Sequence, residues 1–190
     1  MAQSSTTLLP ATSHKTGVTA TDISFTATSG VYTISSTSTI LTGSGKFAVG
    51  DLVTRTGVAT YTVKEVLTST SFTVEEVLST LPADGSTSVV LDHTGFVSTK
   101  AKGDGYYSQA DGVHTVSYHV DATLTGAIKM QGSLATTPTE DDWFDIAGTT
   151  FTTDQSTTIY SANFTGNFVW VRVKATDVTA GSVSKILYNH

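Results

Sequence analysis

The sequence has 190 residues, with ten Lys and Arg against sixteen Asp and Glu, and a formal net charge of −6. This length suffices for one ordinary domain or two small ones. The acidic balance argues against a nucleic-acid-binding protein, because no stripe of positive charge is available to neutralise phosphates. Ser and Thr together supply 60 residues, and Val, Tyr and Phe are also common. This composition favours β-strands and leaves little room for long helices.

Cysteine is absent, which excludes disulfides, thiol catalysis and Cys-ligated metals. No stretch approaches the ~20 apolar residues that a membrane-spanning helix needs, so we expect no membrane partner. The opening MAQSSTTLLPATSHK lacks a basic segment followed by an apolar one, so we expect no secretory signal and synthesis in a host cytoplasm.

Residues 1–15 show neither helical nor strand periodicity and predict an extended N-terminal arm. A disordered terminus is the simplest interpretation of such a segment. The alternative is that the arm adds to an exposed strand of another chain, with Leu8 and Leu9 as apolar anchors. In that case, deleting residues 2–14 would weaken assembly without unfolding either domain.

Residues 16–92 alternate apolar and polar side chains at period two, between turn signals such as Ser29-Gly30. This pattern predicts a small antiparallel β-barrel or β-sandwich domain, because alternation buries one face of each strand. The expected strands are 23–27, 31–34, 51–54, 61–66, 71–77 and 87–91, and a hairpin is expected to turn through 67–71.

Residues 93–113 break this spacing with two Lys, several Gly and the pair Tyr106-Tyr107, and predict a linker or long loop. Residues 114–190 then predict a C-terminal β-sandwich of jelly-roll type, with an overall helix content under about 10%. The expected strands are 116–122, 127–134, 143–147, 157–163, 168–175 and 182–188.

The first domain, with Gly50-Asp51, 61–66 and 70–78 in this order, resembles small β-barrel modules that recur in structural proteins of tailed bacteriophages. The C-terminal part, with 131–134, 140–146, 164–173 and 186–190, is similar to terminal domains of virion proteins from tailed phages, notably those of marine bacteria and cyanobacteria. Its QGSL…DW…FVWVRV progression also resembles discoidin-type jelly rolls, which often bind glycans. These resemblances imply a particle component and bring no catalytic residue with them.

No constellation of residues indicates catalysis, a cofactor or a metal. The stretch Gly43-Ser44-Gly45-Lys46 lacks the first glycine and the hydroxyl of a phosphate loop, so it predicts a turn. His114 and His119 are five residues apart and face opposite sides of one strand, so they are not expected to bind one metal together.

The segment 168–174 is the most informative strand. Val169, Val171 and Val173 share the face expected in the core, whereas Phe168, Trp170, Arg172 and Lys174 share the other face. Aromatic residues and Arg are enriched at the centres of protein interfaces. Three explanations stay open for the second face, namely a covering loop of the same subunit, a subunit contact, and stacking on a sugar ring.

We therefore expect a non-enzymatic virion protein, in particular a head decoration or cement protein that stabilises the capsid as a homo-oligomer, plausibly a trimer, bound to the major capsid protein. The expected interface residues are Leu8, Leu9, Phe168, Trp170 and Arg172. The alternative is a tail or fibre accessory, or a carbohydrate-binding adhesion module that stacks sugars on Trp143, Tyr106 or Tyr107.

Overall fold

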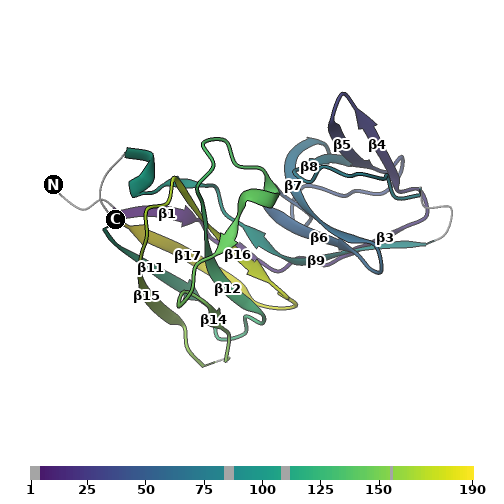
Figure 1. Cartoon of the computed structure of the whole chain (residues 1–190). Helices are drawn as coiled ribbons and strands as arrows, with labels where there is room; N and C mark the ends of the chain where they lie inside the picture. Colours follow the sequence, from purple (N-terminus) through teal and green to yellow (C-terminus); the bar gives the residue numbers. More distant parts are fainter. Residues whose placement is uncertain (1–4, 84–87, 108–111, 155) are drawn as a thin grey trace. The chain divides into compact units, whose positions relative to one another are not determined.

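The computed structural model describes residues 5–83, 88–107, 112–154 and 156–190. It confirms the all-β prediction, since 53% of the residues are in strands and 4% in helices. The strands pair in antiparallel sheets (Figure 1). The chain divides into two compact units, of which the first combines residues 1–14 with 96–190 and the second comprises residues 15–95.

The first unit is a β-sandwich. One of its sheets has the strand order β1-β17-β11-β15, with β2 also paired to β17, and the other has the order β13-β12-β16, with β14 on β12 and β10 on β16. The strands are β1 (Ser5–Leu9), β2 (Thr12–Ser13), β10 (Ala101–Lys102), β11 (Val113–Val120), β12 (Ala127–Ser133), β13 (Phe144–Asp145), β14 (Phe151–Thr152), β15 (Ile159–Thr165), β16 (Trp170–Thr176) and β17 (Ser182–Asn189).

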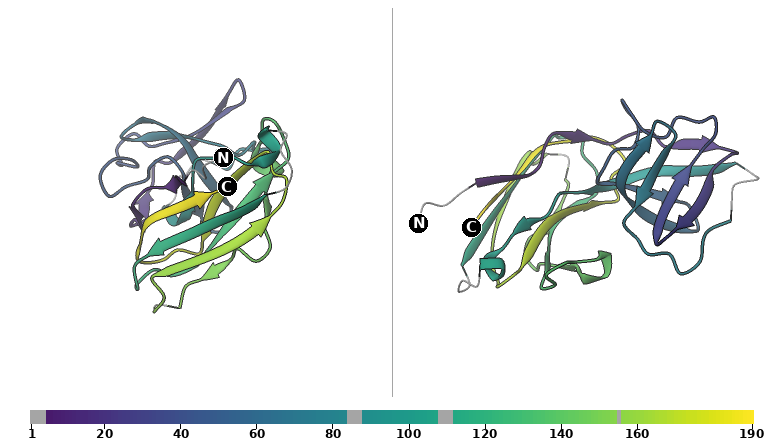
Figure 2. Two further views of the ribbon diagram at one scale, coloured as in Figure 1. Left: turned by 90° about the vertical axis from the view of Figure 1, so that its left-hand side faces the viewer. Right: turned by 90° about the horizontal axis from the view of Figure 1, so that it is seen from above.

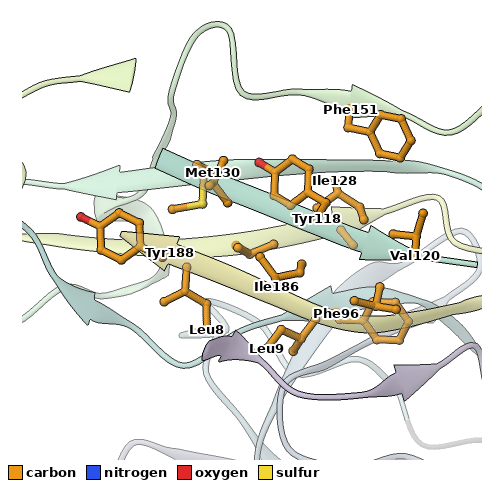
Figure 3. Packing of buried hydrophobic residues seen from close by; sticks show 14 of the residues in the cluster. Leu8, Leu9, Phe96, Tyr118, Val120, Ile128, Met130, Phe151, Ile186 and Tyr188 are labelled. Atoms are coloured by element: carbon orange, nitrogen blue, oxygen red, sulfur yellow. The ribbon is translucent and has the colours of Figure 1, made fainter. Parts of the chain in front are cut away.

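Side chains from both sheets meet in one core, as Figure 3 shows. In β11 every second residue is buried, beginning at His114, as expected for a strand with one covered face. Tyr118 lies fully buried, and its hydroxyl donates a hydrogen bond to the Thr149 carbonyl at 2.8 Å. Burial raises the pKa of this phenol above its usual range.

The N-terminal segment is part of this sandwich. β1 runs antiparallel to β17, with Ser5 opposite Asn189, and the two strands lie side by side in Figures 1 and 2. The register shifts between Thr7 and Leu9, and both Leu8 and Leu9 lie buried in the core of their own unit. The structure thus gives the described part of the expected arm a partner strand within the chain. Residues 1–4 lie outside the described residues.

The second unit has the strand order β6-β7-β8-β5-β4, and β3 pairs with β9. Among the described residues no sheet closes on itself. Of the two architectures predicted for this domain, a β-barrel and a β-sandwich, the barrel is therefore not present. The expected hairpin through 67–71 is present, because β7 and β8 pair from Val63–Val74 to Thr68–Ser71. The strands are β3 (Val18–Ala20), β4 (Ser24–Thr28), β5 (Val31–Ser35), β6 (Asp51–Arg55), β7 (Ala59–Thr68), β8 (Ser71–Val74) and β9 (Val89–Val97).

The β4–β5 connection shows why the turn signals located these strands well. Ser29 and Gly30 both have positive φ, of 52° and 79°, as a two-residue hairpin turn requires. Thr28 and Val31 then pair directly across the turn. The stretch from Gly43 to Lys46 is likewise a turn, in which the Lys46 amide donates to the Gly43 carbonyl at 3.1 Å.

The segment expected as a linker has regular structure at both ends. β9 continues through Val97, β10 covers Ala101–Lys102, and a 3-10 helix, η1, spans Asp104–Tyr107. Residues 108–111 lie outside the described residues. A second 3-10 helix, η2, spans Glu140–Asp142. Neither described helix has the length or apolarity needed to cross a membrane.

Candidate functional site

The first unit carries an exposed cluster of aromatic and basic side chains around β10 and η1. Strand pairing brings Lys102 opposite Trp170. At the next residue, Gly103, a side chain would be impossible, because a Cβ there would lie 2.4 Å from the Phe168 carbonyl oxygen. The chain can therefore pass close to the segment before β16 and present Tyr106 and Tyr107 beside Trp170.

We call Tyr106, Tyr107 and Trp170 the aromatic platform. The Tyr106 ring centroid lies 5.0 Å from that of Trp170 and 5.2 Å from that of Tyr107, both with edge-on geometry. Lys102 Nζ lies 4.0 Å from the Tyr106 ring centroid, and Lys100 Nζ lies 4.6 Å from that of Trp170. Tyr106 and Tyr107 are 43% and 49% exposed. Such a surface offers both stacking and positive charge to a ligand.

A second group of polar side chains adjoins the platform on η1. Asp104 Oδ2 lies 3.6 Å from His114 Nε2, and Asp104 Oδ1 lies 3.4 Å from His190 Nδ1. The His190 ring stacks on Tyr188 and Tyr107, with ring centroids 5.1 and 6.4 Å away. We call Asp104, His114 and His190 the Asp–His cluster.

Hydrogen bonds at both ring nitrogens hold the orientation of His114. Its Nε2 lies 3.0 Å from the Gly166 carbonyl, which can only accept, so Nε2 carries the proton. Its Nδ1 lies 2.8 Å from the Tyr188 hydroxyl, within hydrogen-bond distance. Burial raises the pKa of Tyr188, and the negative charge of Asp104 raises it further.

The loop between β12 and β14 covers the second face of β16. Arg172 is buried, and its guanidinium forms two hydrogen bonds with Glu140, at 2.6 and 2.8 Å. Its Cζ lies 4.2 Å from the Trp143 ring centroid, and Trp170 Nε1 donates to the Thr136 carbonyl at 3.0 Å. Of the three explanations for this face, the structure shows the covering loop of the same subunit at Arg172.

The structure therefore separates the expected site residues. Trp170, Tyr106 and Tyr107 come together in the platform, whereas Trp143 stacks on Arg172 instead. Phe168, Leu8 and Leu9 lie buried in the core of the first unit, which leaves them little surface for another chain. The Asp–His cluster has no signal in the sequence, because its residues are separated by up to 86 positions and show no ligand spacing.

His114 and His119 do lie on opposite faces of β11, as expected from their spacing. His114 is buried, whereas His119 is only partly buried and its Nε2 lies 3.0 Å from Ser117 Oγ. In the second unit, His93 contributes to a buried polar group in which Asp51 forms an ion pair with Lys15 and lies 3.4 Å from His93 Nε2. Asp51 also accepts from the Ala48 amide at 2.7 Å, so its oxygens hold the turn before β6.

The chain matches no protein-family profile, no curated protein and no solved structure. The resemblance to phage structural proteins therefore rests on the sequence patterns alone and stays a prediction.

Proposed function

We propose that the chain is a non-enzymatic structural protein of a tailed-phage particle, in particular a head decoration or cement protein that adds contacts between capsid subunits. The resemblance of its sequence segments supports this function, as does the acidic balance, because a protein facing packaged DNA would more commonly be basic. Its place would be the outer surface of the virion, and a homotrimer would fit the local symmetry of an icosahedral shell.

The distal half of β7 is the structural observation that carries the proposal. All five residues from Lys64 to Thr68 are exposed, including Val66 at 40% and Leu67 at 49%. Neighbouring residues of a strand face opposite sides of the sheet. In the described chain, neither face of this half-strand is therefore covered.

In the part of the chain that the structure describes, one edge of the same half-strand has no partner strand from Lys64 to Leu67, whereas the Thr68 carbonyl accepts from Thr42 Oγ1 at 2.7 Å. β7 pairs with β6 only through Ala59–Thr62, and its distal half pairs with β8 alone among the described strands. An exposed strand with a free edge and apolar side chains favours pairing with another chain. We propose that this half-strand is an assembly contact.

Copy number in purified particles tests the proposed function. Mass spectrometry should find hundreds of copies for a head decoration protein, in proportion to the major capsid protein. A few copies for each particle would favour a tail or fibre accessory instead. Complete absence from particles that carry the major capsid protein would reject the virion function.

A double substitution tests the assembly contact. We expect Val66→Lys with Leu67→Lys to reduce the oligomer of the purified chain, measured by light scattering after size exclusion, or its binding to particles. The matched control is Val77→Lys, which changes a valine that is 80% exposed in the same unit. Equal behaviour of both variants and the wild type would exclude this half-strand as the contact.

A second candidate function is binding of an acidic polysaccharide by the aromatic platform, which would agree with the discoidin-type, jelly-roll resemblance. The specific observation is that Lys102 lies over the exposed rings of Tyr106 and Tyr107, with Lys100 over Trp170. Aromatic rings stack on sugars, and ammonium groups attract anionic substituents.

A glycan array on the whole chain tests this second function. We expect sulfated or uronic glycans to bind and Tyr106→Ala to abolish the signal. Phe144→Ala is the control, because Phe144 is also an exposed aromatic residue of the first unit. A silent array, or equal loss in both variants, would count against the platform as a sugar site.

A further inference from the structure

The Asp–His cluster joins potential metal ligands from three separate parts of the first unit. Asp104 belongs to η1, His114 to β11, and His190 follows β17. Each residue offers one ligand atom, and these atoms all lie within 4.8 Å of one another. Strand pairing holds two of the three segments together, because Thr115, next to His114, pairs with Asn189, next to His190.

The distances match those of a small metal coordination sphere. Zinc bonds of about 2.0–2.2 Å in tetrahedral geometry place neighbouring ligand atoms about 3.3–3.6 Å apart. In the structure, His114 Nε2 lies 3.6 Å from Asp104 Oδ2 and His190 Nδ1 lies 3.4 Å from the other carboxylate oxygen, Oδ1, and one ligand atom from each residue lies within 4.8 Å of the others. Little movement of these side chains would be needed to bind a metal.

The charge of Asp104 is an independent indication of a cation. Asp104 is 6% exposed, and it accepts one backbone hydrogen bond, from Gly112 at 2.7 Å. In the described residues, its ion-pair partners are the two imidazoles and include no Lys or Arg. A buried carboxylate is normally paired with a positive charge, and a bound cation between Asp104 and the two imidazoles would supply one.

The surroundings of His114 suit a metal ligand. Metal-binding histidines usually hydrogen-bond through their second ring nitrogen, which fixes the ring. The Tyr188 hydroxyl lies 2.8 Å from His114 Nδ1, and a hydroxyl can accept as well as donate. If a metal took Nε2, Nδ1 would therefore donate to Tyr188, and the hydrogen bond to the Gly166 carbonyl would be exchanged for the metal–nitrogen bond.

We propose that Asp104, His114 and His190 bind one divalent transition-metal ion of the zinc type. Two imidazole nitrogens and one carboxylate favour such an ion over Ca²⁺ or Mg²⁺, which prefer oxygen ligands only. The His190 side chain is 20% exposed, so solvent can reach the site and complete the coordination. The ion would fix η1, which carries two tyrosines of the aromatic platform, onto the end of β17.

Zinc titration of the full-length chain without a histidine tag tests this site. After treatment with EDTA, calorimetry should show one Zn²⁺ bound for each chain, and Zn²⁺ should raise the melting temperature reversibly. Ca²⁺ and Mg²⁺ should have no such effect. Co²⁺ should give the visible absorption of a cobalt ion with nitrogen and oxygen ligands.

His190→Gln is the decisive variant, because His190 lies outside the paired strands and is partly exposed, so its replacement should leave the fold intact. We expect the affinity for Zn²⁺ to fall at least about tenfold, the lower end of what losing even an outer-shell partner causes. Asp104→Asn should act in the same direction. The matched control is His119→Gln, which removes a histidine from the opposite face of β11. No saturable binding by the wild type, or equal weakening in the His190 and His119 variants, would overturn the site.

Discussion

Carboxylates in this chain act mainly on the backbone amides and hydroxyls of nearby loops. Asp154 accepts from the amides of Ser156 and Thr157 at 2.9 and 2.8 Å. Asp22 does the same across a longer separation, since it accepts from the hydroxyls of Ser36, Thr37 and Ser38. These bonds hold the pKa of both carboxyls well below the usual range. The many hydroxyls of the sequence thus serve loop structure.

Asp22→Asn should reveal this stabilisation through its pH dependence. A carboxyl whose pKa is lower in the folded state stabilises the fold above its unfolded pKa of about 3.9, and this contribution disappears as the pH falls toward the folded pKa. The variant should therefore melt below the wild type at neutral pH, with a difference that shrinks in acid. Thermal melting over a pH series checks this, with the exposed Glu65→Gln as control. A difference that does not change with pH would contradict the argument.

Among the charged side chains, replacement of Arg172 should lower the free energy of unfolding most. Its bidentate pair with Glu140 and its stacking on Trp143 both need a planar guanidinium. We expect Arg172→Lys to lower the free energy of unfolding by about 1–3 kcal/mol, because it leaves buried polar groups unpaired. Urea unfolding measures the change, with the exposed Lys185→Arg as control. A loss below about 0.5 kcal/mol, typical of surface sites, would show that the pair contributes little.

At the level of elements, β1 contributes to the stability of the first unit, whereas the sequence predicted an extended arm. Leu8 is 2% exposed and packs in the core of the first unit beside β17. Leu8→Ala should therefore cost about 2–5 kcal/mol of stability, whereas Thr6→Ala on an exposed position of the same strand should cost far less. Equal and small losses on urea unfolding would mean that β1 detaches readily. Deletion of residues 2–14, for the same reason, should destabilise the first unit.

Local patterns located most strands and missed those that depend on distant partners. Alternation identified β4, β5 and β6 to within a residue or two, because a half-buried strand repeats every two residues. β1 has no such alternation, and its pairing joins residues near position 5 to residues near position 189. The Asp–His cluster was missed for the same reason, since the pairing of β11 with β17 brings His114 near His190 and only the tertiary fold adds Asp104.

At the level of the whole molecule, the second unit is an insertion between two parts of the first. The first and last strands of this unit lie side by side, because β3 pairs antiparallel with β9, with Val18 opposite Leu91. The Lys15 amide also donates to His93 Nδ1 at 3.3 Å. The unit has a core of its own around Phe47, Phe72 and Tyr61.

A fragment of residues 15–95 should therefore fold on its own. We expect a dispersed NMR spectrum and a cooperative melting transition, because the core of the unit and the ladders β3–β9, β4–β5, β5–β8, β6–β7 and β7–β8 lie within the fragment. Val53→Asp, which places a charge in that core, serves as an unfolded reference. A fragment that gives the collapsed spectrum of this reference would show that the insertion depends on the rest of the chain.

The antiparallel pairing of β1 with β17 also determines how the chain responds to a pulling force. Ser5 and Asn189 face each other at the same end of the ladder, so tension applied to these residues loads one hydrogen bond at a time. Such a ladder opens like a zipper at low force, whereas strands pulled from opposite ends resist together in shear. The inserted unit also begins and ends on an antiparallel pair, β3 with β9, and would open in the same manner. We therefore expect the β1–β17 ladder to open at lower force when it is pulled at Ser5 and Asn189 than when its two strands are pulled from opposite ends.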